Sequence, residues 1–154
     1  MEEVMIVHKI RPDELSLSDS IKVLLMIYIK LELEYRDVLS KPAFNGNQVS
    51  AKERNIRIFI HELRFFITKL VLMIKSNMFK FSKLNLGFIN DICTGTIVYS
   101  REAYSPRKVL PELRLSVSDM ERYIPEKRKE FILAYQLSQR ILTILESLVD
   151  AGEL

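Results

Sequence analysis

The sequence predicts an all-α protein, a bundle of about five helices with a short extended N-terminal arm. One observation is the scarcity of turn residues: the 154-residue chain has four Gly and five Pro, which favours long helices over many short strands. Another is the recurrence of apolar residues every three to four positions in two long segments, the spacing of one helix face. At this length we expect one domain, residues 18–154, with a substantial core after an arm of residues 1–17.

The first predicted helix follows the arm and covers residues 18–40. In the arm, apolar residues alternate over positions 4–9 as in a strand or an extended segment, and Pro12 ends whatever element precedes it. Ser18 or Asp19 is expected to cap the helix. Its early part is apolar on nearly all sides, so we expect it to be buried on several of them.

A loop over residues 41–48 separates this helix from the central one, residues 50–76. The loop contains Pro42 and an Asn-Gly pair, both typical of turns. Ser50 and Glu53 have the spacing of a capping box. At about 100° per residue, one side of the central helix is apolar and is expected to be buried; it comprises Ile56, Ile60, Leu63, Ile67, Leu70 and Ile74. A narrow arc elsewhere on the helix is cationic. We call it the stripe, and it comprises Arg54, Arg57, His61, Arg64 and Lys75.

Further helices are predicted at residues 86–104, 109–123 and 125–151. The last has the clearest periodicity, carried by Phe131, Ala134, Tyr135, Leu137, Ser138, Ile141, Leu142, Leu145 and Leu148. Gly152 is expected to end it. Between the central helix and residue 86, a connector alternates Phe79 and Phe81 with Lys80 and Lys83. Such a segment can stack on bases and bind phosphates, although aromatic residues of this kind also pack loops onto a core.

Positive charge is concentrated in the middle of the chain. The net charge is +3 over all residues, but residues 41–83 alone hold nine Lys/Arg and two Asp/Glu. A basic band on a helix is the expected electrostatic footprint of a polyanionic partner such as nucleic acid. The alternative is a solvated helix face.

Several classes of chemistry have no support in the sequence. One Cys and two His cannot form a standard structural zinc site, and we find no phosphate-binding glycine motif or nucleophile elbow. We therefore expect no metal, no cofactor and no catalytic residue. A single cysteine fits a reducing compartment, and we find neither a leader peptide nor an apolar run long enough to span a membrane, so the cytoplasm is the expected location.

One pair of residues suggests an enzymatic alternative. Arg54 and Asn55, followed six positions later by His61, match the Arg-polar-x-His pattern of the HEPN class of helical ribonucleases. In that class the His acts as acid or base and the Arg stabilises charge at the scissile phosphate. A third possibility is a helical adaptor that binds only protein.

From residue 47 onward the segments resemble the small α-helical subunit of type III (Csm-type) CRISPR interference complexes. Residues 49–55, VSAKERN, correspond to the basic element that opens a long helix in this family. Residues 127–135, KRKEFILAY, resemble its basic run leading into a Phe-x-x-x-Tyr element. At Glu102 and Ala103 the chain matches part of a third element, but the Gly-Arg that follows in the family is missing.

The resemblance implies a non-catalytic subunit of an antiviral effector. Its partners would be the guide–target RNA duplex, bound without sequence preference, the backbone and large subunits, and neighbouring copies of itself. Lys52 and Arg54 match the basic residues of the family element. The missing Gly-Arg is the family's second RNA contact, and here Arg101, or Arg107 with Lys108, would take its place. With the helix stripe, the predicted RNA-binding residues are Lys52, Arg54, Asn55, Arg57, His61, Arg64, Lys75, Arg101, Arg107 and Lys108.

Overall fold

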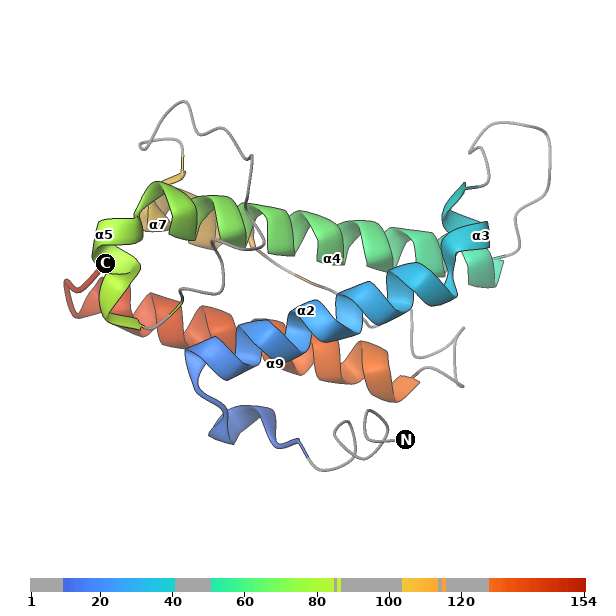
Figure 1. The fold of residues 1–154 in the computed structure, drawn as a ribbon, viewed down its shortest axis with the longest axis horizontal. Helices are drawn as coiled ribbons and strands as arrows, with labels where there is room; N and C mark the ends of the chain where they lie inside the picture. Colours follow the sequence, from blue (N-terminus) through green and yellow to red (C-terminus); the bar gives the residue numbers. More distant parts are fainter. Residues whose placement is uncertain (1–9, 41–50, 85, 87–103, 114, 116–127) are drawn as a thin grey trace.

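The computed structural model describes residues 10–40, 51–84, 86, 104–113, 115 and 128–154 (Figure 1). Its α-helices are α2 (Leu17–Glu34), α3 (Arg36–Ser40), α4 (Ala51–Ser76), α5 (Met78–Phe81), α7 (Pro106–Val109) and α9 (Arg128–Asp150). Three 3₁₀ turns are η1 (Pro12–Glu14), η2 (Ser82–Leu84) and η4 (Leu110–Glu112). The described residues contain no strand, so the predicted all-α class is confirmed.

Three long helices form the body of the bundle. α2 packs against both α9 and α4, and it runs antiparallel to each of them, so α4 and α9 point the same way (Figure 1). The short elements α5 and α7 lie at the C-terminal end of α4, and η1 packs against α9. The Arg140 Nε donates a hydrogen bond to the Leu15 carbonyl at 3.0 Å, which ties the segment after η1 to α9.

The first helix begins earlier and ends earlier than predicted. Its N-cap is Ser16, whose hydroxyl accepts the Asp19 amide at 3.1 Å; this satisfies one of the unpaired donors at the helix start, so Ser18 and Asp19 are not the cap. The helix stops at Tyr35 (φ −107°, ψ 23°), and α3 follows as a separate short helix. The predicted single helix over residues 18–40 is therefore two helices.

The apolar side predicted for the central helix is confirmed. All six of its predicted residues are buried, and Phe59, Phe66 and Met73 are fully buried beside them. This wider buried arc results from packing against α2 and α7 and, at Phe59, against α9. The predicted start at Ser50 lies outside the described residues; α4 ends at Ser76, as expected.

The last helix is confirmed from Arg128 to Asp150, and its predicted start at residue 125 lies outside the described residues. Phe131, Leu137 and Ile141 are buried in the core. Its end is a Schellman motif. Gly152 has φ 77°, its amide binds the Val149 carbonyl and the Glu153 amide binds the Leu148 carbonyl, which satisfies two carbonyls at the helix end. At the other end of α9, the rings of Phe131 and Phe59 meet edge to face with centroids 4.5 Å apart, joining α9 to α4.

The region between α4 and α9 differs from the prediction where it is described. Pro106 lies between the predicted helices 86–104 and 109–123, and it opens α7, because the first position of a helix needs no backbone amide donor. The helix predicted from Val109 becomes the 3₁₀ turn η4 and ends at the extended residue Leu113. The predicted helix over residues 86–104, most of the 109–123 helix and residues 1–9 of the arm lie outside the described residues.

None of the described helices combines the length and apolarity needed to cross a membrane. In the same residues, no three His, Cys, Asp or Glu side chains are grouped so that they could hold a metal ion.

Candidate nucleic-acid interface

Three of the predicted RNA-binding residues lie together on the first turns of α4. Arg54 and His61 are exposed and Arg57 is partly exposed. Within the part of the chain that the structure describes, none of the three has an ion pair or hydrogen bond with another side chain. At a rise of 1.5 Å per residue they extend over about 10 Å of one helix side. Asn55 is partly buried on a different side.

The exposed side of α4 is not purely cationic. Ile58 and Phe65 lie on the same side as Arg54 and His61, because these positions are separated by three, four or seven residues. The side chains of Ile58 and Phe65 are 45 % and 50 % exposed. Cationic and apolar side chains therefore alternate along this side of α4.

Arg64 is held by residues of α2. Its Nε donates to the Tyr28 hydroxyl at 2.8 Å, and one terminal nitrogen lies 3.1 Å from a Glu32 carboxylate oxygen. Burial raises the pKa of the Tyr28 hydroxyl, and a hydrogen bond with Glu32 raises it further, while Arg64 opposes both effects. The hydrogen bond to Tyr28 also raises the pKa of Arg64. One cation of the predicted stripe thus serves to join α4 to α2.

The remaining predicted residues lie elsewhere or outside the described part. Lys75 is partly buried in the last turn of α4 and has an interaction of its own; it is 18 residues, or about 27 Å of helix axis, beyond Arg57. Arg107 and Lys108 are exposed on α7. Arg101 and the side chain of Lys52 lie outside the described residues.

The surroundings of Arg107 are electrostatically mixed. A hollow of about 550 Å³ beside α7 is lined by Arg107 together with Glu146 and Asp150 of α9. These acids offset the positive potential of Arg107, whereas Arg54, Arg57 and His61 have no acidic partner in the described residues. The structure therefore does not bring Arg107 and Lys108, the second predicted RNA contact, together with the cations at the start of α4.

One cation beside the stripe, Lys69, was not predicted from the sequence. The Lys69 ammonium lies over two aromatic rings, 5.6 Å from the centroid of Phe65 and 5.5 Å from that of Tyr104, within the range of cation–π attraction. The Phe65–Lys69 spacing of four residues is visible in the sequence. The contact with Tyr104 depends on the fold.

The structure separates the two aromatic residues of the connector. Phe81 is buried in the core, whereas Phe79 is 92 % exposed. The adjacent Lys80 and Lys83 are exposed as well. One ring of the pair therefore stabilises the fold, and the other is available to a partner.

The chain was compared with protein-family models, with curated proteins and with solved structures, and none of these matches it.

Proposed function

We propose that this chain is a non-catalytic small subunit of a type III CRISPR RNA-guided effector complex, in which the first turns of α4 bind the backbone of the guide–target RNA duplex. The observation that carries this proposal is the group formed by Arg54, Arg57 and His61, which is accessible and has no acidic partner in the described residues. The resemblance of residues 49–55 to the basic element of the Csm-type small subunit supports it.

The chemistry of the group suits a duplex whose sequence is read by base pairing. An A-form helix hides its base edges in a deep, narrow groove, so a protein beside it contacts phosphates and sugar hydroxyls. Arginine pairs with two phosphate oxygens at once through its planar guanidinium. Cations spaced by helical turns can thus follow a strand without selecting a sequence.

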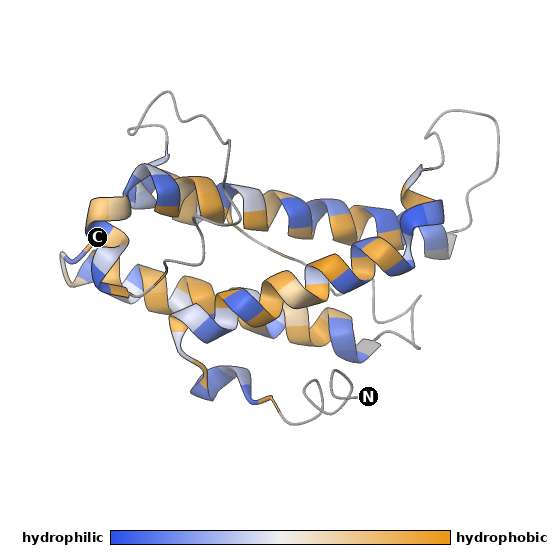
Figure 2. Ribbon diagram, in the orientation of Figure 1, coloured by the Kyte–Doolittle hydropathy of each residue, from blue (hydrophilic) through white to orange (hydrophobic). Residues whose placement is uncertain are grey.

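The apolar surface of α2 fits the protein partners of such a subunit. Met26, Ile29 and Leu33 are 47 to 59 % exposed, and their spacing places them on one side of α2; Figure 2 shows apolar residues along the visible side of this helix. Ile29 and Leu33 line a groove of about 370 Å³ together with Leu39, and the charged side chains of Glu32, Arg36 and Arg64 border it. A contiguous apolar surface of this kind is typical of protein interfaces, and we assign it to a backbone subunit or a neighbouring copy.

The assignment to an effector complex is tested by purification from cells under native conditions. We expect the tagged chain to bring down other subunits together with guide RNA, detected by sequencing of the bound small RNA. Recovery of partner proteins without RNA would favour the adaptor function. Cleavage of added RNA by the pure chain, abolished in His61→Ala, would favour the ribonuclease.

Reversing two charges at the start of α4 is expected to weaken RNA binding. In the double variant Arg54→Glu/Arg57→Glu, we expect the log–log dependence of affinity on salt for a 20-base-pair RNA duplex to become shallower by about two units, one for each phosphate that the variant no longer neutralises. The measurement is fluorescence anisotropy at several salt concentrations, with circular dichroism to show that helix content is kept.

A matched control has the same change of net charge at another place. Lys22→Glu/Arg36→Glu replaces two exposed cations of α2 and α3. If this variant weakens duplex binding as much as the α4 variant, net charge rather than the α4 group determines affinity, and the proposed site is wrong.

Releasing Arg64 from its acidic partner is expected to strengthen duplex binding. In Glu32→Gln the Arg64 side chain, already 43 % exposed, loses its ion pair and becomes available to a phosphate beside Arg57. We expect tighter binding and a salt slope steeper by up to about one unit. Asp37→Asn makes an equal charge change at an exposed residue of α3 and controls for the effect of net charge on binding. A slope that is unchanged in Glu32→Gln would show that the duplex does not reach Arg64.

A further inference from the structure

Phe79 is presented to solvent on a rigid support. Its neighbour Phe81 is buried in the core, and the Ser82 hydroxyl donates to the Phe79 carbonyl at 2.8 Å. Asn77, at the start of α5, donates from one amide nitrogen to the Met73 carbonyl at 2.8 Å and to the Tyr104 carbonyl at 3.0 Å. The backbone that carries the exposed ring is therefore fixed to α4 and to the segment before α7, so little conformational entropy is lost when the ring binds a partner.

The ring borders a hollow of about 380 Å³ between α5 and the end of α9. Apolar side chains of Leu84, Leu148 and Leu154 line it together with Gly152. This volume lies within the range of about 300–1,000 Å³ that small-molecule sites occupy. The hollow is thus large enough for one flat heterocycle, with the face of Phe79 at its edge.

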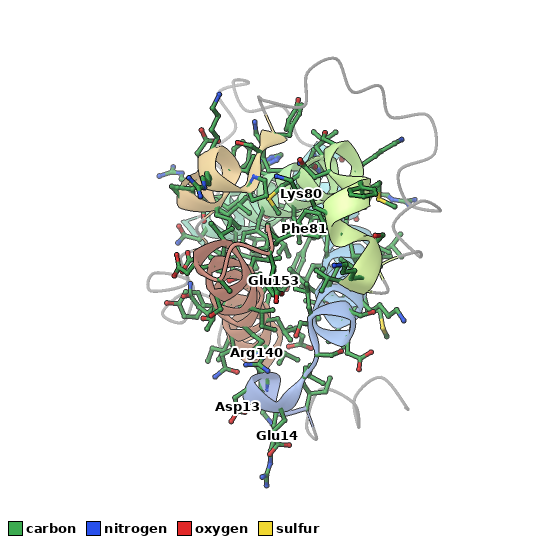
Figure 3. The ribbon with its side chains drawn as sticks, turned by 90° about the vertical axis from the view of Figure 1, so that its left-hand side faces the viewer. Asp13, Glu14, Lys80, Phe81, Arg140 and Glu153 are labelled. Carbon is green, nitrogen blue, oxygen red and sulfur yellow. The ribbon has the colours of Figure 1, made fainter. Side chains whose placement is uncertain are left out.

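Charges around the hollow are divided between two sides. Lys80 and Lys83 contribute cations from α5 and η2, whereas Glu153 lines the hollow from the end of α9. Figure 3 shows Lys80 and Glu153 at the same end of the molecule, with Phe81 between the helices. A phosphate is attracted to the lysines and repelled by the carboxylate, while Glu153 can accept a hydrogen bond from an exocyclic amine. The arrangement suits a ligand that is anionic on one side and flat and uncharged on the other.

An unpaired nucleotide has these properties. An aromatic ring beside cations is the usual means by which proteins bind single strands, since every base has a face that stacks and every linkage carries a negative charge. A duplex does not fit, because its bases are already stacked on one another. An acidic peptide supplies the charge but no flat face of this kind.

We propose that Phe79, Lys80 and Lys83 form a binding site for an unpaired nucleotide of single-stranded RNA, in which the base stacks on Phe79 and the flanking phosphates contact the two lysines. This site is separate from the α4 group and does not depend on it. In an RNA-guided particle it would hold a strand end or a displaced base.

The test uses the full chain and a labelled heptacytidylate, whose bases carry an exocyclic amine and which forms no stable secondary structure at neutral pH. Because Phe79 is almost fully exposed, Phe79→Ala is expected to keep its thermal midpoint and to bind the single strand on the order of tenfold more weakly. Phe79→Trp is expected to retain binding. The chain has no tryptophan, so the introduced indole is a unique reporter, and its fluorescence should be quenched when a base stacks on it.

Controls separate this site from the α4 group. Ile29→Ala removes a half-exposed apolar side chain of α2 and is expected to leave single-strand binding unchanged, while Lys80→Gln/Lys83→Gln should reduce the salt slope by about 1.4 units. The α4 double variant should weaken duplex binding and retain the Phe79-dependent single-strand binding. Unchanged affinity in Phe79→Ala, absence of indole quenching at saturation, or an equal loss for duplex and single strand would each overturn the proposal.

Discussion

Replacing Phe131 with alanine is expected to lower the free energy of unfolding by about 3–5 kcal/mol, the usual cost of emptying a buried phenylalanine site. Phe131 is 1 % exposed and its ring meets Phe59, itself fully buried, edge to face. The variant loses both the buried apolar area and the aromatic pair that joins α9 to α4. Since small domains have a total stability of about 5–15 kcal/mol, we expect a large part of this stability to disappear.

Urea unfolding followed by circular dichroism measures this loss, and a double-mutant cycle with Phe59→Ala measures the ring contact itself. The coupling between the two rings is expected to be about 0.5–1.5 kcal/mol beyond the loss of buried area. Additive effects of the two substitutions would show that the edge-to-face contact contributes nothing of its own. A loss below about 1 kcal/mol in Phe131→Ala would contradict the packing of α9 on α4.

The second large effect is expected at Leu24, and a neighbour on the same helix provides its control. Leu24 is fully buried, whereas Leu33 is 59 % exposed. Leu24→Ala should cost about 2–5 kcal/mol, and Leu33→Ala should stay within about 0.5 kcal/mol. Both substitutions change helix propensity equally, so the difference between them isolates the effect of burial.

Thermal unfolding of the two variants at several protein concentrations makes this comparison. We expect the midpoint of Leu24→Ala to fall by several degrees at least, at about 2–4 °C per kcal/mol for a chain of this size. The midpoint of Leu33→Ala should hardly change. A concentration-dependent loss in Leu33→Ala would show that the outer side of α2 is covered by a second copy in solution.

Periodicity predicted the parts of the fold where one physical rule dominates. α4 and α9 carry apolar residues at helical spacing over about five turns, and burial of that side decides their structure. The start of α2 was harder to predict, because Ser16 and Ser18 are both good caps. The fold selects Ser16, because Leu17 is already buried in the core. The break at Tyr35 is not marked by Gly or Pro, so no local rule indicated it.

The candidate site shows the same division between local and distant causes. The exposure of Arg54 and His61 follows from their positions relative to the apolar side of α4, and the sequence was sufficient to predict it. The ion pair of Arg64 could not be predicted, because Glu32 lies 32 positions away along the chain. Helical spacing shows which side chains share a helix face, whereas the partner of each charge depends on which helices become neighbours.

The packing of α2 on α9 has a consequence for synthesis of the protein. This contact joins elements at opposite ends of the chain, as the hydrogen bond between residues 15 and 140 illustrates. While the ribosome is still translating the middle of the message, the apolar sides of α2 and α4 have no α9 to cover them. Such exposed apolar surfaces are prone to aggregation. The core can be completed only after α9 has been synthesised, and until then the chain depends on chaperones to cover α2 and α4.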